Sequence, residues 1–266
     1  MKKTLLQLVL IGIFLSNSQS IFAEVVSIDM PNSGIFRSNK PVMSLYFQGS
    51  KPKALIIFLA GGWGRIGIRS NTRTLTDPFS KMLIGLTNSK LSSDNYDVVF
   101  MDTPYELYTI PQRDSNEHME RIEATAAYYK KRTNLPVWLM GHSNGALSVS
   151  SFVGYAQEKN RMDLIDGVII SGGRNETWFS PPLSIPVLFI HHEEDACINT
   201  QPRHTYAAYE NLKKFDASLV SYIYIEGGEY DYSDPCTSGY HVYQGAENEA
   251  QAAIDGFLGR LYDSRR

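Results

Sequence analysis

Short apolar runs alternate with helical patterns along most of this chain, and this alternation restricts the fold more than any other feature. Each apolar run is short, rich in Ile, Leu, Val and Phe, and ends in glycine or polar residues, which is typical of strands buried on both faces. Strands that alternate with helices form βαβ units, with parallel strands in one sheet. The sequence therefore predicts an α/β fold with a doubly wound, mainly parallel central sheet and helices on both faces.

Six apolar runs are expected to form the parallel strands, at residues 53–62, 96–104, 136–143, 166–173, 185–195 and 219–228. Helices are expected at 115–132, 144–160, 200–215 and 248–263. The segment before residue 53 holds the patterns VVSIDM and VMSLYF, which predict antiparallel edge strands. In an open sheet of this kind the functional site lies at the carboxyl ends of the strands.

The N-terminus has the pattern of an export signal. Two lysines precede the apolar run TLLQLVLIGIFL, polar residues follow it, and Ala23 is an acceptable residue before a cleavage site. We expect residues 1–23 to be a signal peptide and residues 24–266 to be a single mature domain in the periplasm or outside the cell; the alternative is an uncleaved anchor. No other segment approaches the ~18 apolar residues that span a bilayer, so we expect no stable membrane insertion of the mature chain.

Composition limits the partners. Hydrophobic residues make up 43% of the 266 residues and charged residues 20%, which suits one domain with a full-sized core. The net charge of -3 offers no basic surface, so nucleic acid is not an expected partner. The two cysteines, Cys197 and Cys236, form an even count behind an export signal, and we expect one disulfide between them.

The pentapeptide Gly141-His142-Ser143-Asn144-Gly145 fits the pattern G-x-S-x-G. A chain this rich in glycine and serine produces the pattern by chance about one time in ten. Here it lies directly between a predicted strand and a predicted helix, which is the setting of a nucleophile elbow. The sharp turn requires the glycines, and the helix N-terminus directs N–H groups at the reacting centre. We predict Ser143 as the nucleophile; the alternative is a plain turn in which Ser143 caps the helix.

A serine hydroxyl needs a base, and on this architecture the acid and then the histidine follow the serine along the chain. His241 lies in a glycine-rich loop between the last predicted strand and the last predicted helix, so we predict it as the base. The acid should follow residues 185–192, where Glu193, Glu194 and Asp195 stand together. Asp195 lies deeper in the loop and is our first choice, with Glu194 second. The alternatives are an unpartnered loop histidine and a solvated acidic turn.

The oxyanion hole of such a site is built from backbone N–H groups. One donor is predicted at Asn144, directly after the nucleophile. The second should lie in the glycine-rich turn at residues 60–64, where Gly62 is our choice and Trp63 the alternative. A glycine-rich turn alone is weak support, because glycines end strands in many proteins.

The two cysteines lie close in sequence to the predicted acid and the predicted base. Cys197 follows Asp195 by two residues and Cys236 precedes His241 by five, so a bridge would brace the acid loop against the base loop. The adjacent pair His191 and His192 is not expected to bind a metal, because neighbouring strand residues point to opposite faces.

Taken together, these motifs resemble the α/β-hydrolase superfamily over nearly the whole mature chain. The chain is similar in particular to a group of exported bacterial α/β-hydrolases of poorly defined activity, in which a GG turn, an MDTP-like strand end, an Arg and a His before a helix, G-x-S-x-G, and two Cys beside the acid and the base recur together. The matching residues here are Gly61, Gly62, Asp102, Arg113, His118, Ser143, Asp195, Cys197, Cys236 and His241. The chain departs from the group after the base, where Val242 and Tyr243 stand in place of Gly and a large apolar residue.

The expected function is a serine hydrolase of esterase type that acts on small-molecule or polymeric acyl esters without a cofactor. The short stretch between the strands at 166–173 and 185–192 leaves no room for a large lid, which favours an accessible site. Acyl transfer or peptide cleavage by the same residues, and a catalytically silent binding scaffold, are the alternatives. For Asp102, Arg113 and His118 we favour a structural role over a catalytic one.

Overall fold

An eight-stranded sheet forms the centre of the molecule, with strand order β1-β2-β4-β3-β5-β6-β7-β8. The structure is a computed structural model and describes residues 23–30, 40–88, 95–103, 110–231 and 233–263. Strands β3 to β8 run parallel to one another, whereas β1 pairs antiparallel with β2 and β2 antiparallel with β4. The predicted doubly wound, mainly parallel sheet with antiparallel N-terminal edge strands is therefore confirmed. The expected signal peptide, residues 1–23, lies outside the described residues except for Ala23.

The strands are β1 (Ala23–Ile28), β2 (Val42–Phe47), β3 (Pro52–Leu59), β4 (Asn95–Met101), β5 (Val137–His142), β6 (Gly167–Ser171), β7 (Val187–His192) and β8 (Val220–Ile225). The α-helices are α1 (Pro78–Gly85), α2 (Ile110–Arg113), α3 (Asn116–Thr133), α4 (Asn144–Glu158), α5 (Pro202–Lys213) and α6 (Glu247–Asp263). Short 3-10 helices are η1 (Leu86–Asn88), η3 (Met162–Leu164) and η4 (Gly239–Val242). No helix in these described ranges is both long and apolar enough to cross a bilayer.

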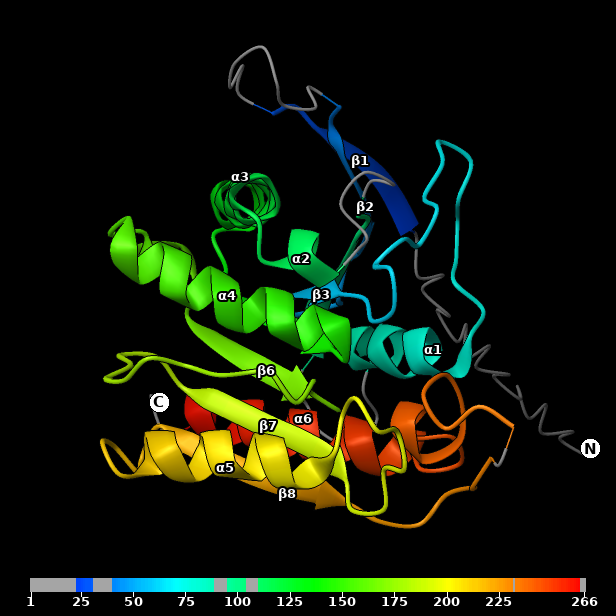
Figure 1. Cartoon of the computed structure of the whole chain (residues 1–266). Coiled ribbons are helices and arrows are strands. Elements are labelled where there is room, and N and C mark those ends of the chain that lie inside the picture. Colours follow the sequence, from blue (N-terminus) through cyan, green and yellow to red (C-terminus); the bar gives the residue numbers. More distant parts are fainter. Residues whose placement is uncertain (1–22, 31–39, 89–94, 104–109, 232, 264–266) are drawn as a thin grey trace, which may run out of the picture.

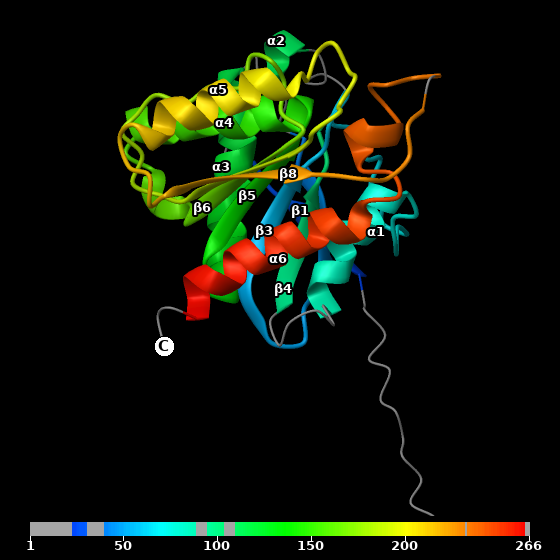
Figure 2. The same cartoon turned by 90° about the horizontal axis from the view of Figure 1, so that it is seen from below.

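Helices cover both faces of the sheet. Helices α3, α4 and α5 pack on one face and α1 and α6 on the other, with the antiparallel hairpin β1-β2 at one edge and β8 at the opposite edge (Figures 1 and 2). Each face has its own buried cluster, because strands such as β4 and β5 are buried along their length and send alternate side chains to both sides. The predicted layer arrangement is therefore present.

Helix boundaries follow ordinary capping rules. Helix α3 begins after Ser115, whose hydroxyl accepts the N–H of His118, and it ends at Asn134 in the left-handed conformation. Helix α1 was not predicted, because its eight residues are too few for a periodic pattern, although Asp77 caps it and Pro78 starts it. Helix α1 brings the Phe79 ring to 4.5 Å from the ring of His142, beside the predicted nucleophile.

Candidate active site

The predicted nucleophile lies in a strained turn between β5 and α4. Ser143 has φ 55° and ψ -118°, a conformation that costs free energy for any residue other than glycine. Its side chain makes no capping hydrogen bond to the helix, so Ser143 does not act as an ordinary side-chain N-cap of α4. Strain of this kind is maintained only where the surroundings determine it, and it is concentrated at functional sites.

Three glycines permit this turn. A Cβ added at Gly61 would lie 3.0 Å from Cβ of Ser143, and one at Gly141 would lie 2.2 Å from the carbonyl oxygen of Gly145. A Cβ at Gly145 would lie only 1.9 Å from the carbonyl oxygen of Leu59 at the end of β3. The glycines of the pentapeptide are therefore required by close backbone packing, as the motif predicts.

This packing gives a prediction for two glycines of the same helix. Gly145→Ala should lower the free energy of unfolding by about 3 kcal/mol or more, because backbone of β3 would have to move. Gly154→Ala is the matched control: an added Cβ there meets nothing within 4 Å, so it should raise stability by roughly 0.5–1 kcal/mol. Chemical denaturation of both variants measures this difference, and equal effects on the two would contradict the packing described.

The two predicted oxyanion donors are joined by a side chain. The N–H of Asn144 is the first of α4 and makes no backbone hydrogen bond within the described residues, as is usual at a helix start. Gly62, with φ 54°, lies in a turn closed by the N–H of Gly64 and the carbonyl of Gly61 at 2.8 Å. The Asn144 side chain donates to the carbonyl oxygen of Gly62 at 2.7 Å. It thereby connects the nucleophile turn to the glycine turn.

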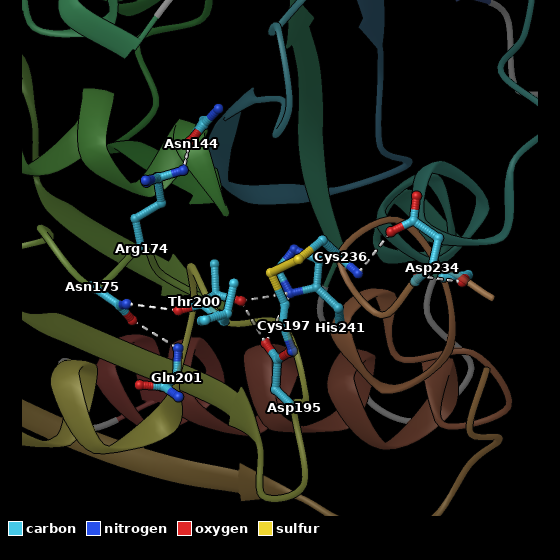
Figure 3. The surroundings of a disulfide bond; sticks show 12 residues. Asn144, Arg174, Asn175, Asp195, Cys197, Thr200, Gln201, Asp234, Cys236 and His241 are labelled. Carbon is cyan, nitrogen blue, oxygen red and sulfur yellow. Dashed lines mark hydrogen bonds and ion pairs between the residues drawn. A yellow bond between two sulfur atoms is a disulfide. The ribbon is translucent and has the colours of Figure 1, made fainter. Parts of the chain in front are cut away.

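Arg174 extends this connection and was missed by sequence reasoning. Its Nη1 donates to Oδ1 of Asn144 at 3.0 Å (Figure 3). Its Nε donates to Glu176 at 2.9 Å. Arg174 follows β6 by three residues, so its position at the carboxyl edge of the sheet was the only available signal. The hydrogen bonds from Arg174 to Asn144 and from Asn144 to Gly62 hold the glycine turn against the start of α4.

Asp102 and Arg113, for which we favoured a structural role, also hold the loop that follows β3. The Asp102 carboxylate accepts the N–H groups of Ile66, Gly67 and Ile68 at 2.7–3.2 Å. Fully buried Arg113 donates to the carbonyl oxygen of Ala60 at 2.8 Å, and its burial lowers its pKa to about 10. These contacts position the predicted oxyanion loop.

The predicted acid and base are in direct contact. His241, in η4, bonds through Nδ1 to Oδ2 of Asp195 at 2.8 Å, and both side chains are buried. Thr200 Oγ1 donates to the same Oδ2 at 3.0 Å, and the N–H of Cys197 donates to Oδ1 at 2.9 Å (Figure 3). The second-choice acid, Glu194, is exposed to solvent. The carboxylate that meets the base is therefore that of Asp195.

Electrostatics keep this carboxylate ionised. Burial disfavours the charged form of Asp195, but hydrogen bonds from His191 and His241 outweigh it and hold the pKa of Asp195 well below its usual range. An ionised carboxylate beside an imidazole orients the ring and stabilises its cationic form. With Nδ1 of His241 donating to Asp195, Nε2 of His241 is the ring nitrogen that can accept a proton.

The predicted disulfide is present. Cys197 and Cys236 are bonded, with their Cα atoms 4.6 Å apart and a separation of 39 positions in the chain. The bond ties the loop that carries Asp195 to the loop that precedes His241 (Figure 3). Closure of a loop of this length would stabilise by ~4 kcal/mol in the chain-entropy model, and it braces the acid against the base.

His142, the residue before Ser143, lies against the predicted base. The ring of His142 lies 4.7 Å from the ring of His241, and a Cβ added at Gly172 would lie 3.0 Å from Cε1 of His142 and 3.5 Å from Cε1 of His241. The Ser143 hydroxyl itself makes no hydrogen bond with a described residue. The serine–base bond is often long without substrate. The structure thus joins acid to base by a hydrogen bond and brings the residue before the serine against the base.

The adjacent histidines of β7 face opposite sides, as the strand period predicts. His192 stacks on Tyr240 with ring centroids 4.1 Å apart and bonds the carbonyl oxygen of Gly227 at 2.6 Å. His191 instead bonds Asp195, with Nε2 at 3.1 Å from Oδ2. The contact of His191 with the acid was not predicted, because nothing in the sequence distinguishes the two faces of β7.

Three buried histidines predict how stability depends on pH. Burial lowers the pKa values of His118, His142 and His191, so all three are neutral in the folded chain. Unfolding restores values near 6.5, so this stability is present above that pH and is lost as pH falls below it. We expect the free energy of unfolding, and with it Tm, to fall between pH 7 and 5; each histidine that stays neutral in the folded chain contributes up to about 1.4 kcal/mol per pH unit to the slope of that free energy.

Calorimetry in buffers of different ionisation enthalpy checks this expectation. Unfolding near pH 5 should take up about one proton for each of these three histidines that is still neutral in the folded chain. Unfolding without proton uptake, or a Tm independent of pH in this range, would show that these histidines are already charged in the folded chain.

Comparison with solved structures identifies the architecture. The chain is similar to an esterase from Pyrobaculum calidifontis (TM-score 0.61, 11% identity, covering 90% of this chain and 85% of that one). It is also similar to dienelactone hydrolase from Anabaena variabilis (0.59, 14%, 90% and 97%) and to a lidless α/β serine hydrolase from Xanthomonas campestris (0.55, 12%, 90% and 94%). No family model matches the sequence, and no curated protein matches it significantly.

These likenesses and the strand order define the class of structure. The chain has the α/β-hydrolase fold, and the part of it that the structure describes includes no large lid between the sheet strands. The predicted site residues lie where that fold gathers its chemistry, at the carboxyl ends of β3, β5 and β7 and in the loop after β8.

Proposed function

We propose that this protein is a serine hydrolase that cleaves carboxylic esters through Ser143, His241 and Asp195. The observation that carries the proposal is the pairing of a strained serine at the start of α4 with a buried histidine–carboxylate pair at the same edge of the sheet. Resemblance in fold to proteins named as esterases and hydrolases agrees with it. A fold alone does not determine activity, so the side chains carry the argument.

The reaction follows from the groups present. Nε2 of His241 removes the hydroxyl proton of Ser143 as Oγ attacks the ester carbonyl carbon. The backbone N–H groups of Asn144 and Gly62 stabilise the oxygen that gains the negative charge. His241 then returns the proton to the alcohol that leaves, and an acyl-enzyme forms. Water, activated by the same histidine, releases the acid and restores the serine; Asp195 orients the imidazole throughout.

The connection between β6 and β7 supports small or extended acyl esters as substrates. It spans residues 172–186 and includes no helix or strand, so no large cap covers the sheet at this point. An open site does not require interfacial opening to admit its substrate. The named relatives include a dienelactone hydrolase, whose substrate by its name is a lactone, which is a cyclic ester.

Export to an oxidising compartment is part of the proposal. The disulfide between Cys197 and Cys236 supports it, because such bonds persist in the periplasm and outside the cell. The N-terminal pattern of residues 1–23 has the composition of a cleavable signal.

A panel of p-nitrophenyl esters, from acetate to palmitate, tests the function. We expect hydrolysis of short and medium acyl chains by the purified mature chain, and none by Ser143→Ala. An added primary alcohol or amine that captures the acyl group in preference to water would assign the same residues to acyl transfer. Absence of hydrolysis by folded protein across esters and peptides would favour a silent scaffold.

A further inference from the structure

A second histidine contacts the carboxylate of Asp195, at the same oxygen that meets His241. His191, at the end of β7, is fully buried, and its Nε2 lies 3.1 Å from Oδ2 of Asp195. Its Nδ1 lies 2.7 Å from Oγ1 of Thr205 in α5. Thr205 Oγ1 is in turn 3.1 Å from the hydroxyl of Tyr222 in β8. The acid is thus connected to two structural elements that the proposed reaction does not otherwise use.

The protonation states of these groups determine which atom donates in each hydrogen bond. An ionised carboxylate only accepts, so Nε2 of His191 carries the proton and donates to Asp195. Burial lowers the pKa of His191, so the ring is neutral, and its Nδ1 must accept from the hydroxyl of Thr205. The carbonyl oxygen of Pro202 also lies 3.0 Å from Oγ1 of Thr205. If Thr205 donated its proton there, a lone pair of Oγ1 would face the lone pair of His191 Nδ1 at 2.7 Å. Tyr222 can then donate to Thr205.

Neither nitrogen of His191 is available to a substrate. Nε2 is occupied by Asp195 and Nδ1 by Thr205, and the side chain has no exposed surface. His191 therefore is not an alternative base to His241. Within the described residues, its hydrogen bond to the proposed catalytic side chains is the one to Oδ2 of Asp195, the oxygen that also meets His241 at 2.8 Å.

We propose that His191 is a positioning residue that fixes the rotation of the Asp195 carboxylate so that Oδ2 faces His241. This inference rests on the proposed function. The terminal torsion of an aspartate is broad and is set by the donors around it. The donors here are His191, Thr200 and the N–H of Cys197, in addition to His241. The His191 donor is itself held in one tautomer by Thr205.

Two amide substitutions of similar polarity separate this role from simple packing. In His191→Gln the amide nitrogen can reach the place of Nε2 and donate to Asp195. In His191→Asn the amide reaches only the place of Nδ1, so the contact with Thr205 can persist while the donor to Asp195 is lost. His192→Asn, on the opposite face of β7, controls for the loss of a buried imidazole.

Ester hydrolysis by the oxidised full-length mature chain provides the first readout. We expect kcat of His191→Asn to fall by about tenfold or more with KM unchanged, because only the orientation of the base is impaired. His191→Gln should recover most of the wild-type kcat, and His192→Asn should keep it. Equal kcat for the Gln and Asn variants, or a loss confined to KM, would overturn the proposal.

A proton NMR spectrum provides a readout that needs no turnover. The Nδ1–H of His241, bonded to a buried carboxylate, should give a downfield resonance in the wild type and in His191→Gln. That signal should move upfield or disappear by exchange in His191→Asn. An unchanged signal in His191→Asn would overturn the positioning role. If the wild type hydrolyses no ester but the signal responds in this way, the proposed function fails while the positioning of Asp195 stands.

Discussion

Replacement of Ser143 by alanine should abolish ester hydrolysis while the fold is retained. We expect kcat/KM to fall by roughly 10⁵-fold or more, because removal of the nucleophile leaves only the oxyanion donors and binding to promote the reaction. Stability should change little, because the hydroxyl makes no hydrogen bond with a described residue and its removal therefore leaves no such partner unsatisfied. Steady-state kinetics with a p-nitrophenyl ester and a thermal melt of the same preparation measure both quantities.

The matched control for this variant is Ser148→Ala, in the same helix. Ser148 is fully buried and bonds Arg113 and His118, so its loss should reduce stability but leave most of the activity. The prediction for Ser143 fails if Ser143→Ala retains more than a small fraction of the wild-type kcat/KM, or if Ser148→Ala proves equally inactive while folded.

The second large effect is expected at the acid. Asp195→Asn should lower kcat by about 10⁴-fold, because an amide that donates to His241 favours the wrong tautomer of the imidazole. Some loss of stability should accompany it, since the amide nitrogen would also face donors from His191 and Thr200. The same ester assay measures kcat, and circular dichroism establishes that the variant is folded.

Glu194→Gln is the matched control for the acid. Glu194 is the adjacent carboxylate and is exposed to solvent, so its neutralisation should leave kcat within about twofold. The opposite ranking, with Glu194→Gln inactive and Asp195→Asn active, would assign the acid to Glu194 and contradict the geometry of the buried pair.

Much of the fold could be predicted from local patterns. The runs that became β3 to β7 are apolar because both faces of a central parallel strand are covered, and this leaves a continuous signal in the sequence. The turn at Ser143 was predictable for a similar reason: the strand, the glycines and the helix are consecutive. Helix α1 was missed because a helix of eight residues depends on its cap and on contacts with distant segments.

The parts of the candidate site that were not predicted are contacts between distant segments. The side chain of Asn144 reaches Gly62, 82 positions earlier, and Arg174 reaches Asn144 across 30 positions. His191 lies close to Asp195 in the chain, but only the packing of α5 against β7 shows which strand face meets the acid. Sequence order predicted the chemistry, whereas the supporting hydrogen bonds required the folded chain.

Covalent labelling with a fluorophosphonate, followed by peptide mass spectrometry, tests the central claim most directly. Such a probe phosphonylates a serine only where a base and an oxyanion hole activate it. The account predicts one adduct, on the peptide that contains Ser143, and no adduct in Ser143→Ala. Folded wild-type protein that takes up no label, or a label that persists in Ser143→Ala, would contradict the assignment of Ser143 as an activated nucleophile.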